Sequence, residues 1–157
     1  MSASDFWENI SFSEKNVIFS LKGNNKSDVL AELIDNVLVC NKLDLSRQDV
    51  LDSFLAREKK GSTGLPNGIA VPHIRCRDMI DKVLMAVGIH REGVDFKSLD
   101  KKPAHLIILT IVPEEMTDFH LIFLSRVSSF LFKLNLEKDL LRLSKKSSLY
   151  EMMRKKI

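Results

Sequence analysis

The amino-acid sequence predicts an α/β protein in which α-helices cover both faces of a mixed β-sheet. Two observations indicate this class, and a third indicates the number of domains. Short runs rich in β-branched residues alternate along the chain with segments whose apolar residues recur three and four positions apart. The run at 106–112 is almost entirely apolar, as is typical of a central strand that is buried on both faces. No repeat, low-complexity segment or long linker divides the 157 residues, so we expect a single domain over 1–157.

The first half of the chain is expected to form one strand followed by two helices. Residues 16–21 make a short β-branched and aromatic run, which indicates a strand. Ser27 is expected to cap the first helix, and Ser46 with Asp49 is expected to open the second, which Gly61 ends. The expected apolar stripes consist of Val29, Leu30, Leu33, Ile34, Val37 and Leu38 in the first helix and Val50, Leu51, Phe54 and Leu55 in the second.

The second half is expected to contain three strands and then three helices. The strands are predicted over 69–71, 83–90 and 106–112, and the helices from about 117 and over 136–143 and 149–155. Pro113 is expected to end the apolar strand. The long helix that begins at Thr117 should bury Phe119, Ile122, Phe123, Val127, Phe130 and Leu131.

Composition excludes several classes of protein. With 45% hydrophobic and 29% charged residues, the chain resembles ordinary globular proteins. The net charge of +3 is too small, and its basic residues too dispersed, to indicate nucleic-acid binding. No apolar run approaches the ~20 residues of a membrane helix, and no secretory pattern is present, so we expect a cytoplasmic protein without membrane insertion. Cys40 and Cys76 lack metal or redox spacing and are expected to be buried, reduced thiols.

The segment from residue 57 to residue 73 concentrates the groups that phosphoryl transfer requires. His73 offers an imidazole whose ordinary pKa lies near cellular pH, so that a neutral, nucleophilic fraction is always present. Arg57 offers a planar guanidinium that suits phosphate oxygens better than the point charge of lysine does. Hydroxyls and backbone amides that could serve as further donors belong to Ser62, Thr63 and Gly64. A second imidazole, His120, interrupts the apolar pattern at the start of the long helix.

Spacing alone leaves simpler interpretations open. A histidine after a proline is commonly a loop residue, and a Gly-Ser-Thr-Gly run is commonly a turn. Arg57 is explained adequately by the dipole of the helix that it ends. The remaining histidines, His90 and His105, fall in predicted strands and are expected to be structural. His73 and Cys76 lack the second pair that a zinc site needs, and the glycine-containing loop lacks the Lys-Ser/Thr ending of a nucleotide-binding P-loop.

A family resemblance adds what spacing cannot supply. The runs REKKGSTG at 57–64 and NGIAVPH at 67–73 closely resemble the active-site signature of the fructose/mannitol-type enzyme IIA domains of the bacterial phosphoenolpyruvate-dependent phosphotransferase system (PTS). This family includes the nitrogen-regulatory enzyme IIA proteins. The resemblance continues through GVDF at 93–96, Asp100, the strand that ends at Pro113 and His120-Leu121, and it covers roughly residues 16–145.

The resemblance implies a fold, a reaction and a set of roles. The fold would be the PTS enzyme IIA type 2 fold, with a mixed sheet between helices. His73 would be the phosphoacceptor, which takes a phosphoryl group from the phosphocarrier protein HPr or a paralogue of it. Arg57 would neutralise phosphate charge and His120 would support the phosphohistidine, while Ser62, Thr63 and Gly64 would line the phosphate pocket. The resemblance implies no nucleotide, metal or other cofactor.

One departure from the family pattern affects the loop. Leu65-Pro66 stands where many members have an apolar residue and a glycine. Proline removes an amide donor and stiffens the loop, so the sequence does not predict which amides hold the phosphate.

Two functions of different class follow from the resemblance. One is a regulatory protein whose phosphorylation state determines which target proteins it binds. The other is a sugar-transport component that passes phosphate to a separate enzyme IIB. The chain shows neither a cysteine phosphoacceptor domain nor a membrane domain, and a stand-alone chain of this length favours the regulatory type. The Gly-Ser-Thr-Gly run is shared by both types and does not separate them.

Overall fold

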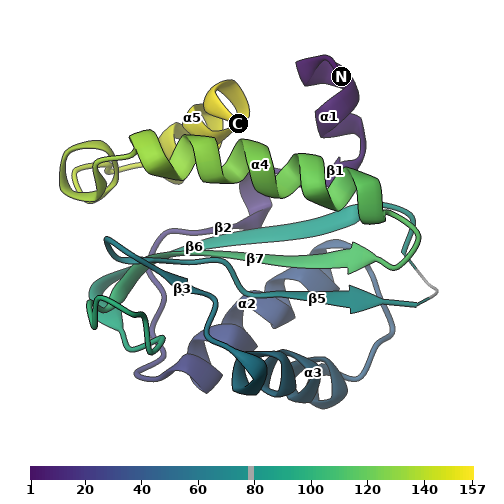
Figure 1. The fold of residues 1–157 in the computed structure, drawn as a ribbon, viewed down its shortest axis with the longest axis horizontal. Helices are drawn as coiled ribbons and strands as arrows, with labels where there is room; N and C mark the ends of the chain where they lie inside the picture. The colour runs from purple at the N-terminus through teal and green to yellow at the C-terminus, as the bar shows by residue number, and fades with distance from the viewer. Residues whose placement is uncertain (78–79) are drawn as a thin grey trace.

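A mixed β-sheet lies between two layers of helices in the computed structural model, which describes residues 1–77 and 80–157. In Figure 1, α1, α4 and α5 lie above the sheet, and α2 and α3 lie below it. This arrangement confirms the predicted α/β class. The helices are α1 Ala3–Glu8, α2 Lys26–Cys40, α3 Arg47–Lys60, α4 Thr117–Lys133 and α5 Lys146–Lys156, with the shorter η1 Glu14–Asn16 and η2 Leu136–Leu140. The strands are β1 Ile10–Ser11, β2 Val17–Ile18, β3 Gly64–Leu65, β4 Ile69–Ala70, β5 His73–Cys76, β6 Val83–Val94 and β7 Ala104–Pro113.

The sheet is built around the long antiparallel pair β6 and β7, in which Val87 lies opposite Ile108. On one side, β1 and β2 pair with β6 in parallel. On the other side, β4 and then β5 pair with β7 in parallel. The short strand β3 pairs with β4 as an antiparallel hairpin. This topology places β5, which begins with His73, directly beside the centre of the sheet.

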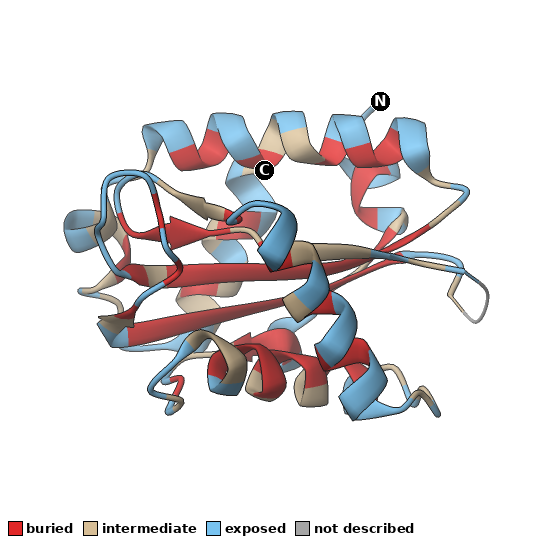
Figure 2. Cartoon of the chain, turned by 60° about the horizontal axis from the view of Figure 1, so that its bottom comes forward, coloured by how far each residue is buried: buried red, intermediate tan, exposed pale blue. Residues whose placement is uncertain are grey.

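Alternation along the two central strands produces a core on each face of the sheet. In β6, Met85 and Val87 face the α4 side, whereas Leu84 and Ala86 face the α2 side. This is the two-residue period of a strand. Because both faces are covered, the two strands are buried along almost their whole length (Figure 2), as predicted for 106–112.

Several predicted boundaries were wrong. The predicted strand over 16–21 is replaced by η1 followed by the two-residue β2. The elements before them, α1 and β1, were not predicted. Asn25, and not Ser27, caps α2, because its side chain accepts a hydrogen bond from the Asp28 backbone N. Ser46 caps α3 in the same way, as predicted, and Gly61 ends it.

Two burial predictions were also wrong. Ile122 is 37% exposed, because it lies on the outer side of α4 while Phe119 and Phe123 face the core. Cys40 is exposed at the last position of α2, beyond the end of that helix's buried stripe, and Cys76 is only half-buried. Among the described residues, no helix is both long and apolar enough to cross a membrane.

Candidate active site

His73 begins β5 with its imidazole oriented by the neighbouring backbone. It lies opposite Thr110 of β7, whose backbone N donates to the Pro72 carbonyl at 3.0 Å. The ring Nδ1 is 3.0 Å from the carbonyl oxygen of Val71. A carbonyl oxygen only accepts hydrogen bonds, so this contact assigns the proton to Nδ1. The lone pair of the neutral ring is therefore on Nε2, the atom that can act as a nucleophile.

His120 lies in the second turn of α4 and faces His73. The ring centroids are 5.5 Å apart, with the planes at 61°. His120 is only 5% exposed, and its Nε2 has no hydrogen-bond partner among the described residues. Burial, together with the smaller effects of the nearby His73 and Arg75, lowers the pKa of His120 from its ordinary 6.5 to about 4. His120 is therefore neutral near pH 7, with an unused ring nitrogen at the site.

Arg75 is a member of this site that the sequence analysis missed. Its Nη1 donates to the hydroxyl of Thr117, the first residue of α4, at 2.9 Å. This bond holds a guanidinium near the helix turn that carries His120. A sequence signal for Arg75 was available, because residues two apart in a strand point to the same face and Arg75 follows His73 by two.

Arg57 lies in the last turn of α3, beside β5. Its Nη1 donates to the carbonyl of Gly61 at 2.9 Å, which stabilises the end of the helix. Together with Arg75 and Ile74 it lines a hollow of 320 Å³. Across the residues that the structure describes, no hydrogen bond joins Arg57 to His73. The structure thus brings the two histidines together and places Arg57 next to the residues that follow His73.

The loop after α3 uses its polar groups to hold its own shape. The Ser62 hydroxyl donates to the Phe96 carbonyl and accepts from the Gly64 backbone N at 2.9 Å. Thr63 is buried, and both its hydroxyl and its backbone N donate to Glu58. A Cβ at Gly64 would collide with the Ser98 hydroxyl, so any larger residue here would require Ser98 to move. Binding of phosphate by Ser62, Thr63 and Gly64 stays a prediction.

Glu58 anchors this loop, and the sequence analysis did not assign it a role. Its side chain is 5% exposed and forms an ion pair of 2.8 Å with Lys26, whose side chain is 18% exposed. It also accepts from Thr63, so one carboxylate joins the start of α2 to the loop. Its position in the sequence was a signal, because Glu58 follows the buried Phe54 by four residues and lies on the same helix face.

Replacing Glu58 with alanine is expected to lower the free energy of unfolding by about 3 kcal/mol, because it leaves the Lys26 ammonium and two donors of Thr63 without their partner. Urea unfolding measures the change. The control is Glu114→Ala, which removes an exposed ion pair with Arg77 and should cost far less than the loss of Glu58. Equal losses in the two variants would show that Glu58 is not an anchor.

The lowered pKa of His120 predicts a pH dependence of stability. Unfolding returns the pKa from about 4 to its ordinary 6.5, so the unfolded chain binds a proton that the folded chain does not. Stability is therefore lost as the pH falls from 6.5 towards 4, by about 2 kcal/mol between pH 7 and pH 5. Urea unfolding at the two pH values should show this extra loss in the wild type and not in His120→Gln. The same pH dependence in both proteins would refute the assignment.

The protein is of the α/β class, with two imidazoles facing one another beside the central strands. The model of the family described as "Phosphoenolpyruvate-dependent sugar phosphotransferase system, EIIA 2" matches residues 10–156. The chain belongs to this family.

Relatives of two kinds are similar in sequence. A nitrogen regulatory protein of Pseudomonas aeruginosa is 33% identical over 140 residues, which cover 87% of each chain. The fructose-specific EIIABC component of the PTS in Bacillus subtilis is 31% identical over 134 residues, or 85% of this chain and 21% of that protein. This chain therefore spans about a fifth of the Bacillus protein.

Solved structures show the same fold. The nitrogen regulatory protein IIA-Ntr of Neisseria meningitidis has a TM-score of 0.82 at 28% identity, covering 93% of this chain and 97% of that chain. IIA mannitol of Escherichia coli has a TM-score of 0.74 at 20% identity, covering 91% and 99%. The Escherichia coli enzyme IIA for mannitol, solved in complex with phosphorylated enzyme IIB, has a TM-score of 0.71 at 16% identity, covering 92% and 97%. The last two show likeness of fold alone.

Proposed function

We propose that this protein accepts a phosphoryl group on Nε2 of His73 from the phosphohistidine of an HPr-type phosphocarrier protein. The observation that carries the proposal is the assigned tautomer of His73 beside a neutral His120. Membership of a phosphotransferase family supports the reaction type. Such a role places the chain in the cytoplasm and requires no cofactor.

The transfer is in line. The Nε2 lone pair of His73 forms a bond to phosphorus while the bond between phosphorus and the donor's imidazole nitrogen breaks, and the donor ring keeps the electron pair. The Nδ1 proton of His73 stays on the bond to Val71 throughout, which holds the ring in place and preserves the neutral nucleophile. The charge in the transition state is spread over three oxygens, so positioning and fixed cations supply most of the catalysis.

Three side chains near His73 suit this charge. Arg75 and Arg57 bring guanidinium groups to the residues around β5. When a phosphoryl group binds, the Arg57 guanidinium can exchange its hydrogen bond to the Gly61 carbonyl for bonds to the phosphoryl oxygens. His120 presents a buried nitrogen that no described residue bonds, which supports its role as a donor to the phosphoryl oxygens. Since a neutral imidazole donates only one hydrogen bond, that role requires the proton of His120 to lie on Nε2.

The reaction is tested by incubating the protein with phosphoenolpyruvate, enzyme I and HPr. We expect a phosphoryl group that is stable in alkali and labile in acid, as a phosphohistidine is. A folded wild-type protein that remains unlabelled, in a mixture that labels a known enzyme IIA, would overturn the proposal.

Once His73 carries the phosphoryl group, we propose that the protein has a regulatory role, in which phosphorylation changes the binding of target proteins. The likeness to IIA-Ntr of Neisseria meningitidis, in both fold and sequence, supports it. The alternative is a sugar-transport role with transfer to enzyme IIB, which the likeness to the Bacillus fructose component favours. The phosphorylated protein should keep its label when mixed with fructose- and mannitol-type enzyme IIB domains. Rapid loss of the label to either domain would decide for transport.

A further inference from the structure

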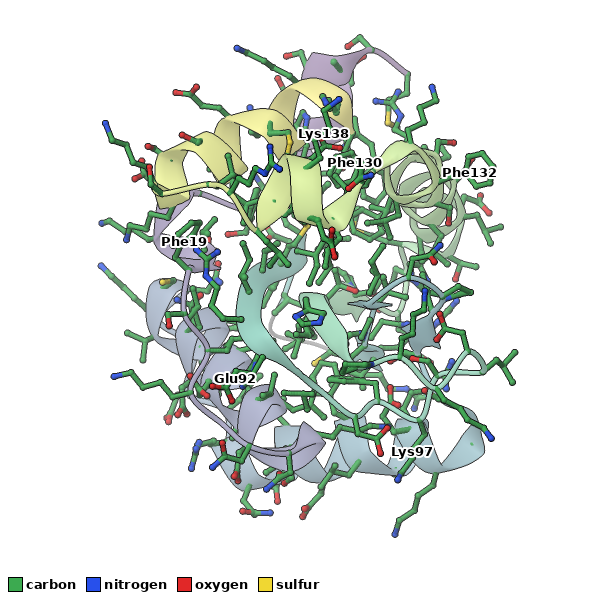
Figure 3. All side chains as sticks on the ribbon, turned by 90° about the vertical axis from the view of Figure 1, so that its left-hand side faces the viewer. Phe19, Glu92, Lys97, Phe130, Phe132 and Lys138 are labelled. Atoms are coloured by element: carbon green, nitrogen blue, oxygen red, sulfur yellow. The ribbon has the colours of Figure 1, made fainter. Side chains whose placement is uncertain are left out.

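A second cleft lies at the end of the molecule where the β3–β4 hairpin turns. Figure 3 views this end, with η2 and its Lys138 on one side and the loop of Lys97 on the other. The cleft has a volume of 560 Å³, within the range of small-molecule sites. None of the residues that line it belongs to the pair of histidines described above. Its walls are the hairpin tip, the start of β7, the end of α4 and η2, with Asn67, Gly68, Lys102, Pro103, His105, Lys133, Leu134, Asn135, Leu136, Glu137 and Leu141.

Two lysines and two asparagines line this cleft, namely Lys102, Lys133, Asn67 and Asn135. The positive charge of Lys102 also acts on the carboxylate of Asp100. Within the described part of the chain, the ammonium groups of Lys102 and Lys133 form no ion pair. The side-chain amide nitrogens of Asn67 and Asn135 donate no hydrogen bond to any described residue, although Asn135 uses its oxygen to cap η2. The two lysines come from different walls, one before β7 and one at the end of α4. Two lysines and two asparagines around one cavity suit the oxygens of an anion.

The cleft also offers acceptors. Nδ1 of His105 is 2.9 Å from the carbonyl oxygen of His90, so the proton lies on Nδ1 and the lone pair on Nε2. Glu137 lines the same cavity, and its carboxylate belongs to no ion pair among the described residues. Hydroxyl groups are the partners that suit such acceptors. Opposite the polar groups, a carbon skeleton would meet the apolar surface of Pro103, Leu134, Leu136 and Leu141.

We propose that this cleft binds a small hydroxylated organic anion, that is, a polyol carrying a phosphate or a carboxylate. The acidic group would lie between Lys102 and Lys133, and the hydroxyls would donate to His105 and Glu137. A phosphate and a carboxylate share a negative charge next to hydroxyl groups. Comparing a phosphorylated probe with a carboxylated one distinguishes between them.

The hairpin connects this cleft to His73. Its tip, at Asn67 and Gly68, lines the cleft, and the Gly68 carbonyl accepts from the backbone N of His105 at 2.8 Å. At the other end, Val71 donates its backbone N to the Thr63 carbonyl at 3.0 Å and holds the ring of His73 through its own carbonyl. A ligand against the tip therefore contacts the element that orients the nucleophile. We therefore expect a bound ligand to change the rate of phosphoryl transfer to His73. This expected change in rate rests on the proposed function, whereas binding of the ligand does not.

Binding is tested on the unphosphorylated protein by calorimetry and by amide NMR, with glucose 6-phosphate, gluconate and glucose as probes. We expect the phosphate or the carboxylate to bind at least tenfold more tightly than uncharged glucose and to shift the resonances of Gly68, Lys102 and Asn135. Lys102→Glu with Lys133→Glu should weaken binding at least tenfold. Lys138→Glu is the matched control, because Lys138 lies on η2 without lining the cleft, and it should bind as the wild type does.

Three results would overturn the site: no binding of either anion at millimolar concentration, binding that survives the double charge reversal, or shifts confined to residues around His73 and His120. His73→Ala should bind the anion normally, which separates this site from the phosphoacceptor.

With the wild type, saturating anion should change the rate of phosphoryl transfer from HPr. Binding without a change in rate would refute the coupling through the hairpin.

Discussion

His73→Ala is expected to accept no phosphoryl group from phosphorylated HPr under conditions that label the wild type fully. The variant removes the only atom at the site assigned as a nucleophile, Nε2 with its lone pair free. His120 cannot replace it readily, because that ring is 5% exposed and fixed within α4. The measurement is transfer of radioactive phosphate from phosphoenolpyruvate through enzyme I and HPr, resolved on a gel.

Two further variants make this result specific. His73→Asn keeps a side-chain amide that can donate to the Val71 carbonyl, so it preserves the local structure without a nucleophile and should also remain unlabelled. His90→Gln changes a histidine far from the site and can keep the hydrogen bond that its Nε2 donates to the Gly23 carbonyl. It should be labelled as the wild type is. A labelled His73→Asn would show that another residue is the phosphoacceptor.

Arg57→Ala is expected to slow phosphoryl transfer by roughly 10²–10³, the usual loss when one donor to a developing negative charge is removed. The same assay measures the initial rate with rapid quenching. Arg57→Lys should recover part of the rate, because lysine restores the charge without the planar fork.

The matched control for Arg57 is Lys60→Ala. Lys60 lies one turn away on α3 and lines the same hollow, and its loss removes a positive charge without removing the guanidinium. Its transfer rate should stay close to that of the wild type. A similar fall in both variants would mean that only general positive charge matters here, and an unchanged Arg57→Ala would remove Arg57 from the mechanism.

The order of the main elements was predictable because their patterns are local. The stripe of α2 and the apolar run of β7 each repeat with a period that belongs to one kind of structure. Short elements were missed because they contain no such local pattern. Strands of two residues, such as β1 and β2, are too short to show a period, and their pairing with β6 depends on residues about 70 positions away.

Part of the candidate site was predictable as well. The segment that carries Arg57 and His73 is continuous in sequence, and its likeness to a known family identified it. Arg75 and Glu58 were not assigned roles, because a charged residue gains a role only through what it contacts. Arg75 reaches Thr117 across 42 residues, and Glu58 reaches Lys26 across 32.

The sequence by itself therefore determined the class of fold, most of the helices, the central strands and the single residue expected to carry phosphate. These depend on local periodicity and on a continuous motif. Only the tertiary structure decided which nitrogen of His73 holds the proton, that His120 is neutral, and that the hydroxyls of Ser62 and Thr63 are already bonded within the protein. The physical reason is that protonation and hydrogen bonding depend on burial and on nearby groups, and folding brings those groups together from distant parts of the chain.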